Sequence, residues 1–194
     1  DFKIAHDCYT KLFYKKNEFP SSNDGNEYLQ FLAQGGYMVG KLATLYYPDG
    51  IEISTGNDHN LAVKQTEKYL DQDDVTLFEA SILSKAKLIR IDILKKENKT
   101  LHLIEVKSKS YDPDDNLDNN DYKDYLFDVG FQYFVLQEKF PDYKIIPYLF
   151  MPDKSKATSI EGLAFLFQIE ENKTDSKFRS FNITVPTDRI KDLV

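Results

Sequence analysis

Residues 75–107 read VTLFEASILSKAKLIRIDILKKENKTLHLIEVK, and this stretch decides the fold. It holds three runs that are rich in β-branched and other apolar residues, at 75–83, 88–94 and 101–107. The two connections between these runs, 84–87 and 95–100, are short and largely polar. Because strands joined by such short connections pair as antiparallel hairpins, we expect two successive hairpins and three neighbouring strands.

The positions of the turns predict which residues face each other. If the first hairpin closes around Lys85-Ala86, Glu79 lies opposite Asp92. If the second closes around Asn98-Lys99, Asp92 lies opposite Glu105. Residues directly opposite one another point to the same sheet face. The turns therefore predict a row of three carboxylates across three strands, and a slip of one residue would break it.

This row has a chemical consequence, because each carboxylate interrupts an apolar strand. Lys107 follows Glu105 by two residues and so belongs on the same face. Carboxylates that repel one another are costly to bury, and a divalent cation with hard oxygen ligands removes that cost. Such a cation can activate water and stabilise the charge that develops during phosphoryl transfer. The alternative is a solvated sheet face that happens to be charged.

Outside this stretch, hydrophobic periodicity and turn residues predict the remaining elements. Helices are expected over residues 25–47, 58–70 and 121–140. Strands are expected over residues 143–151 and 162–169. The tail from Ile183 is expected to open another helix.

The residues of the carboxylate row resemble a known family. Asp92 followed by Glu105-Val106-Lys107 is similar to the Asp…Glu-X-Lys core of the PD-(D/E)XK nuclease superfamily, with Ile91 in the position of the name-giving proline. The resemblance implies a restriction-endonuclease-like α/β fold, in which helices flank a mixed central β-sheet. It also implies a metal-dependent nuclease.

Further motifs resemble the RecB-like branch of that superfamily and the related nucleases of CRISPR systems. The match is closest to an uncharacterised bacterial RecB-like family, and the order of its motifs is its most specific feature. These motifs are Cys8–Tyr14, Gly36–Gly40, Thr76–Ala80 and Asp128–Tyr133. Two positions depart from the pattern. Gly40 stands where such enzymes often have a metal-binding His, and Leu136 stands where a Tyr is usual.

The resemblance implies roles for the residues of the core. Asp92 and Glu105 would be the principal ligands of Mg²⁺ or Mn²⁺, and the backbone carbonyl of Val106 would also reach the metal. Glu79 would be an auxiliary ligand or a base, replacing the missing His. Lys107 would orient the attacking water.

Three further residues are candidates for nucleic-acid binding. Gln132 could hold the nucleic-acid backbone or a water at the metal, or it could simply form the polar edge of a helix. Lys109 is a candidate phosphate contact, or else a solvated lysine. Tyr133 could replace, on an adjacent helix face, the Tyr that the motif lacks at Leu136.

Cys8 has two interpretations that the sequence leaves open. Many relatives bind an iron–sulfur cluster through one N-terminal and three C-terminal cysteines, and a cluster generally needs four thiolates. This chain has one cysteine, so Cys8 could serve a cluster only with cysteines beyond Val194. Otherwise it is a small buried hydrophobic residue.

Length and composition set the outer limits. The 194 residues suit a single domain, with a helical part over about 1–72 and the core over about 73–170. The chain opens with Asp1 rather than Met, so we expect it to be part of a longer protein. The single cysteine, and the lack of a signal pattern or of apolar runs long enough for a bilayer, predict a cytoplasmic protein without membrane partners.

The charge bears on function. A net charge of −7 is unusual for a general nucleic-acid binder, because affinity for phosphate comes largely from Lys and Arg, but a local basic patch can coexist with it. We expect a deoxyribonuclease of DNA repair, recombination or defence, acting on single-stranded DNA or DNA ends. The alternatives are a catalytically inactive module for nucleic-acid binding or assembly, and a nuclease domain that works with further domains or a helicase partner.

Overall fold

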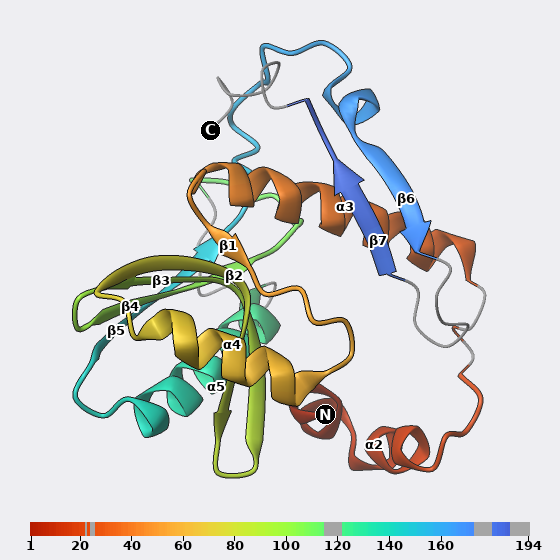
Figure 1. Cartoon of the computed structure of the whole chain (residues 1–194). Helices are drawn as coiled ribbons and strands as arrows, with labels where there is room; N and C mark the ends of the chain where they lie inside the picture. The colour runs from red at the N-terminus through yellow and green to blue at the C-terminus, as the bar shows by residue number, and fades with distance from the viewer. Residues whose placement is uncertain (22, 24–25, 115–121, 173–179, 187–194) are drawn as a thin grey trace. The chain divides into compact units, whose positions relative to one another are not determined.

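The computed structural model describes the whole chain except residues 22, 24–25, 115–121, 173–179 and 187–194 (Figure 1). The chain divides into two compact units, Asp1–Gln34 and Gly35–Val194. The division falls inside α3 (Glu27–Leu45). Helix α4 (His59–Leu70) packs on the sheet of the second unit, because its apolar face is buried there.

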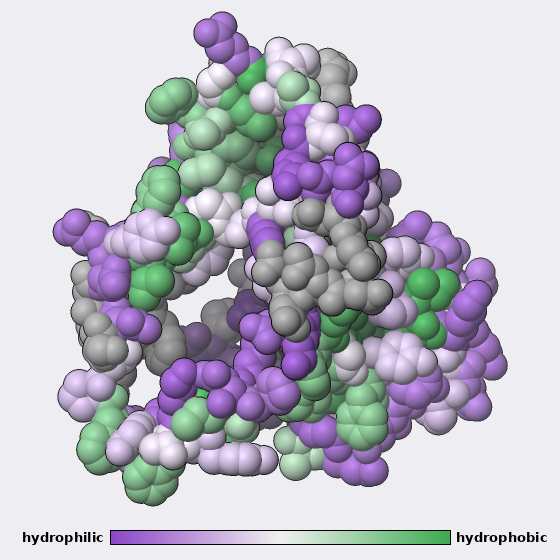
Figure 2. All heavy atoms as spheres, turned by 180° about the vertical axis from the view of Figure 1, so that it is seen from behind, coloured by the Kyte–Doolittle hydropathy of each residue, from purple (hydrophilic) through white to green (hydrophobic). Residues whose placement is uncertain are grey.

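The first unit is helical. It contains α1 (Phe2–Asp7), α2 (Tyr9–Lys16) and the first residues of α3. Large hydrophobic side chains remain exposed on these helices, among them Tyr9, Phe13, Tyr28 and Phe31. The space-filling view shows hydrophobic residues exposed beside hydrophilic ones on the surface that faces the viewer (Figure 2).

Five strands of the second unit form one mixed sheet in the order β1-β2-β3-β4-β5. They are β1 (Ile51–Glu52), β2 (Asp74–Ser84), β3 (Lys87–Glu97), β4 (Thr100–Val106) and β5 (Lys144–Phe150). The three central strands pair antiparallel, while β1 joins β2 and β5 joins β4 in parallel. The expected α/β fold, with a mixed central sheet flanked by helices, is confirmed.

Both predicted hairpin turns are confirmed. Ser84 pairs with Lys87 around Lys85-Ala86, and Glu97 pairs with Thr100 around Asn98-Lys99. Each two-residue turn begins with a residue of positive φ, 53° at Lys85 and 52° at Asn98. A positive φ at this position lets a short turn follow the right-handed twist of the strands. The turns therefore set the register of β2, β3 and β4.

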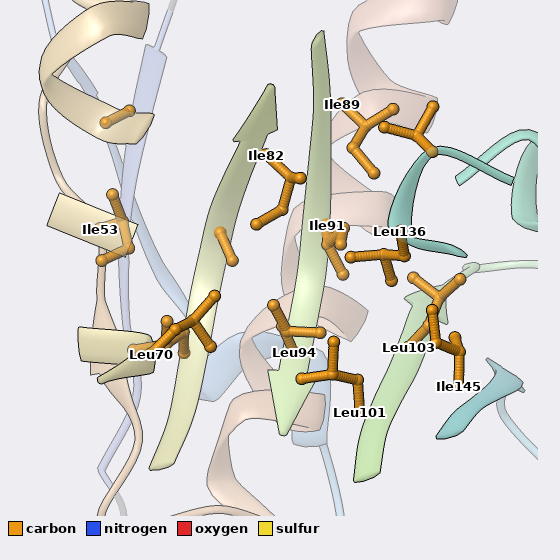
Figure 3. Packing of buried hydrophobic residues seen from close by; sticks show 14 of the residues in the cluster. Ile53, Leu70, Ile82, Ile89, Ile91, Leu94, Leu101, Leu103, Leu136 and Ile145 are labelled. Atoms are coloured by element: carbon orange, nitrogen blue, oxygen red, sulfur yellow. The ribbon is translucent and has the colours of Figure 1, made fainter. Parts of the chain in front are cut away.

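The larger hydrophobic core covers one sheet face, which we call the α4/α5 face after the helices packed on it. Helix α5 spans Lys123–Lys139. Side chains of β2, β3, β4, β5 and both helices meet in this core (Figure 3). The labelled residues are Ile53, Leu70, Ile82, Ile89, Ile91, Leu94, Leu101, Leu103, Leu136 and Ile145. The opposite sheet face, the α3 face, carries a smaller cluster that includes Ala43 of α3.

Polar contacts fix α4 at both ends. At its start, the side chain of Asp58 accepts a hydrogen bond from the Leu61 N–H at 2.9 Å, which is a typical N-cap. At its end, the ammonium of Lys96 in β3 donates to the carbonyl oxygens of Leu70 and Gln72 at 2.9 and 2.5 Å. A buried lysine thus satisfies the last carbonyls of the helix and joins the helix to the sheet.

The predicted helices over 25–47, 58–70 and 121–140 correspond to α3, α4 and α5, and the strand over 143–151 corresponds to β5. The single strand predicted over 162–169 is wrong. Gly162 has a φ of 67°, and a 3₁₀ helix at Leu163–Leu166 precedes β6 (Gln168–Asn172). A left-handed residue cannot continue an extended strand, so the strand begins later.

The helix predicted from Ile183 is also wrong for the residues that the structure describes. Ile183 lies in β7 (Ser180–Thr184), which pairs antiparallel with β6. The remainder of that prediction, at 187–194, lies outside the described residues. Within the described part of the chain, no helix has the length and apolar character needed to cross a membrane.

Gly50 offers a direct test of how tightly the α3 face is packed. A Cβ at this position would lie 2.1 Å from the ring of Phe78, which is 9% exposed and cannot easily move aside. We expect Gly50→Ala to lower the free energy of unfolding by about 1–3 kcal/mol through overpacking. Urea denaturation measures the change.

Gly130 in α5 is the matched control, because a Cβ there meets no atom within 4 Å. Gly130→Ala should raise stability by about 0.5–1 kcal/mol, since alanine favours a helix over glycine. Equal stability of Gly50→Ala and the parent protein would show that Phe78 is free to move.

Candidate metal centre

In the β2–β3 hairpin, the regular alternation of side chains between the two sheet faces is broken at one level. Phe78 pairs with Ile93, and both belong to the cluster on the α3 face. Ala80 pairs with Ile91, and both belong to the core on the α4/α5 face. Residues two apart along a regular strand share a face, so alternation is broken between these two pairs. The break occurs in both strands together, and the register continues unchanged across it.

Glu79 and Asp92 are the residues at this break. Glu79 has a φ of 57°, a left-handed value that is uncommon for a residue other than glycine. Backbone strain of this kind costs about 1–3 kcal/mol and is concentrated at functional sites. The sequence placed these two residues opposite each other, and the strands are distorted at that level.

Asp92 also joins β3 to β4 through its side chain. The regular pairing of these strands extends to Ile93 and Ile104. Beyond that pair, the backbone N–H of Val106 donates to Asp92 Oδ2 at 2.7 Å. The carboxylate takes the place of a backbone acceptor, because a buried N–H needs a partner. The side chain of Asp92 is therefore held against the backbone of Val106, the residue that follows its predicted neighbour Glu105.

Glu105 is a buried carboxylate held by two donors. It is 5% exposed and lies on β4 in the sheet face that α5 covers. Its Oε2 accepts a hydrogen bond from Gln132 Nε2 at 2.6 Å, and its Oε1 accepts one from Lys107 Nζ. Burial raises the pKa of Glu105 to about 7, and the nearby charge of Asp92 adds to the effect.

Lys107 lies between two carboxylates from different elements. Its Nζ donates to Glu105 of β4 and, at 3.0 Å, to Asp128 Oδ2 of α5. The Tyr125 ring centroid lies 5.5 Å from Nζ, a cation–π distance. Burial alone would lower the pKa of Lys107, but its bonds to Glu105 and Asp128 outweigh that effect and raise the pKa to about 12. Lys107 therefore stays charged.

Asp128 is a site residue to which the sequence assigned no role. It is 7% exposed, and it lies one helical turn before Gln132, so both side chains project from the same face of α5. The spacing of four residues between Asp128 and Gln132 was the one feature of the sequence that indicated a shared helix face. No local pattern pairs a carboxylate on α5 with a lysine that directly follows β4.

Glu79, the third carboxylate of the expected row, forms an ion pair with an arginine. Its Oε2 lies 2.6 Å from Nε of Arg90, and 41% of its side chain is exposed. Partial burial of the carboxylate raises the pKa of Glu79, and the negative charge of Asp92 adds to the rise. The positive charge of Arg90 opposes both effects. Asp92 thus acts electrostatically on both Glu79 and Glu105, while Glu79 itself pairs with an arginine.

Asp92 and Glu105 carry carboxylate oxygens, the ligand type that a hard divalent cation prefers. Mg²⁺ is usually held by one or two carboxylates, with water and substrate oxygens completing its shell. Within the described residues, no group of three or more His, Cys, Asp or Glu side chains is arranged to hold a metal ion. The Gln132 Oε1 is a buried acceptor with no hydrogen-bond partner among the described atoms.

Charge also favours a cation here. The cluster contains the carboxylates of Asp92, Glu105 and Asp128 but one ammonium, that of Lys107, and Glu105 and Asp128 are buried. Its formal excess of negative charge is costly in a poorly solvated place. A divalent cation would balance it, and Val106 follows Glu105 with a backbone carbonyl as a further donor.

The other predicted residues lie around this cluster or apart from it. Lys109 Nζ is 4.9 Å from the ring centroid of Tyr122, and Tyr133 is 37% exposed on α5. A Cβ at Gly40 would meet no atom within 4 Å. Cys8 belongs to the first unit, where it is the N-cap of α2, and backbone N–H groups of Lys11 and Thr10 lower the pKa of its thiol.

No family model, curated protein or solved structure matches this chain. The class that the structure defines is an α/β protein with a five-stranded mixed sheet flanked by helices. The resemblance to PD-(D/E)XK nucleases therefore rests on the sequence motifs alone.

The raised pKa of Glu105 predicts a pH-dependent stability in metal-free buffer. The folded protein binds this proton more tightly than the unfolded chain, whose glutamates titrate near 4.5. The free energy of unfolding should therefore fall as pH rises from about 4.5 to about 7, and then level off. Glu105→Gln should remove on the order of 1–3 kcal/mol of this fall, as measured by urea denaturation with EDTA present.

Glu138→Gln is the control for this measurement. Hydrogen bonds from Lys85, Ser84 and Lys87 lower the pKa of Glu138 to about 2, so its contribution is lost as pH falls from about 4.5. From about pH 5.5 to about pH 7 its offset from the parent should stay constant. An offset for Glu105→Gln that is equally constant would contradict the burial argument.

Proposed function

We propose that the protein is a Mg²⁺- or Mn²⁺-dependent nuclease that hydrolyses DNA phosphodiester bonds, with a restriction-endonuclease-like core of the RecB-like type. The observation that carries the proposal is the cluster of Asp92, Glu105 and Lys107 beside Gln132, in which Glu105 and Gln132 are buried and the other two are partly buried. Acidic and basic groups are rarely buried without a role, because removing charges from water is costly. Strongly shifted carboxylates of this kind are frequent at functional sites.

Each residue of the cluster has a distinct task in this proposal. Asp92 and Glu105 would hold the cation, and the Val106 carbonyl directly follows Glu105 in the chain. Lys107 neutralises the charge that develops on the phosphate and orients the attacking water. Gln132 keeps the Glu105 carboxylate in place through its amide N–H. A bound Mg²⁺ or Mn²⁺ would orient the phosphate and lower the pKa of the water.

Glu79 has a secondary task in this scheme. Because it pairs with Arg90 at a half-exposed position, it serves as an auxiliary base or second-metal contact rather than a principal ligand. Lys109 lies two residues after Lys107, and Tyr133 directly follows Gln132. In this proposal both contact the phosphate backbone of the substrate. The biological setting that we propose is DNA repair, recombination or defence.

A second function has an observation in its favour. Lys107 already pairs with both Glu105 and Asp128, and the net charge of −7 disfavours general affinity for nucleic acids. A catalytically inactive module for nucleic-acid binding or assembly would keep this ion-pair cluster as a structural link. Metal calorimetry separates the two functions, because the inactive module would bind no divalent ion at Asp92 and Glu105.

Cleavage assays with Mn²⁺ on single-stranded and double-stranded DNA, with RNA alongside, test the proposed activity. We expect DNA cleavage that EDTA abolishes. Asp92→Asn and Lys107→Ala should each reduce the rate at least about 100-fold, because each removes a charge that acts on the transition state. Initial rates on a labelled oligonucleotide measure the change.

Exposed positions on α4 supply matched controls for these substitutions. Asp71→Asn and Lys68→Ala make the same chemical changes away from the cluster and should leave the rate within about twofold. Unchanged cleavage by Lys107→Ala, or no cleavage by a preparation that binds Mn²⁺, would reject the proposed activity. Cleavage of RNA alone would change the substrate class.

A further inference from the structure

Lys107 forms ion pairs with both Asp128 and Glu105. The ammonium lies between the two carboxylates, and the three side chains are 16%, 7% and 10% exposed for Lys107, Glu105 and Asp128. One carboxylate comes from the sheet and the other from α5. The ammonium therefore has two alternative counter-charges within reach.

Both oxygens of Glu105 are engaged in the arrangement that the structure describes. Oε1 accepts from Lys107 and Oε2 accepts from Gln132. A cation that binds Glu105 competes with these donors for the carboxylate oxygens. The amide of Gln132 is neutral, whereas the ammonium of Lys107 is repelled by a second positive charge. Lys107 is therefore the donor that a bound cation pushes away.

A buried ammonium that withdraws from one carboxylate needs another partner. Asp128 Oδ2 lies 3.0 Å from Nζ, and Asp128 projects from a helix that is packed on the sheet. The Tyr125 ring, three residues earlier on α5, lies on the same side as this carboxylate and faces Nζ. These groups hold the ammonium close to the cluster after it leaves Glu105.

We propose that Asp128 is a positioning residue, which retains Lys107 beside the metal centre and so frees the Glu105 carboxylate for the cation. The inference rests on the proposed metal centre. Asp128 contacts neither substrate nor cation in this scheme, and it acts through Lys107. Of the two carboxylates that Lys107 contacts, the loss of Asp128 leaves Glu105. The ammonium then competes with the cation for the Glu105 carboxylate.

A double-mutant cycle on Mn²⁺ affinity tests this role without relying on activity. The four proteins are the parent, Asp128→Asn, Lys107→Met and the double variant, with Mn²⁺ titrated by calorimetry. In the parent background, Asp128→Asn should weaken Mn²⁺ binding by about 30-fold, because neighbouring groups in one network couple strongly. In the Lys107→Met background the same change should cost about threefold, from the lost charge alone.

Asp128→Glu supplies a second variant. It keeps the charge and can still reach Lys107, so its Mn²⁺ affinity should stay within about threefold of the parent. This comparison remains decisive if Asp128→Asn fails to fold, as judged by circular dichroism. A 30-fold loss in Asp128→Glu would then overturn the proposal.

The outcomes separate the proposals. An equal or larger effect of Asp128→Asn in the Lys107→Met background would overturn the positioning role and make Asp128 a direct or long-range partner of the cation. Binding of Mn²⁺ with the expected coupling but no DNA cleavage would leave the positioning role intact and reject the nuclease. No binding of Mn²⁺ by the parent would overturn both.

Discussion

The ammonium of Lys107, held between a carboxylate of the sheet and a carboxylate of α5, is the interaction on which the candidate site depends. Glu105 is buried beneath the helix, and burial of a carboxylate without a counter-charge would be costly. Lys107 offsets that cost and links β4 to α5 through Asp128. The hydrogen bond from Gln132 completes the link and orients the carboxylate.

The sheet contributes through an irregularity at one level. At the level of Glu79 and Asp92, the alternation of side chains between the two sheet faces is broken in both β2 and β3. Asp92 there accepts a hydrogen bond from the Val106 N–H of β4. A regular ladder would satisfy that N–H with a carbonyl oxygen. The irregularity thus brings an acidic side chain into the plane of the sheet, beside Glu105, without loss of a buried hydrogen bond.

Much of the fold follows from local patterns in the chain. The hairpins around Lys85-Ala86 and Asn98-Lys99 were predictable because polar turns separate apolar strands, and α5 was predictable from its apolar stripe. The prediction failed at Gly162, where a left-handed backbone ends the extended conformation, and at Ile183, whose strand exists through its pairing with β6. Local pattern does not reveal such a pairing partner.

The sequence by itself determined the three central strands and their register, because turn geometry acts over a few residues. The tertiary structure decided which charges meet. Glu79 pairs with Arg90, and Lys107 is shared with Asp128 from a helix about twenty residues further along the chain. Those choices depend on how α5 packs against the sheet, and packing brings together side chains whose positions no local pattern relates.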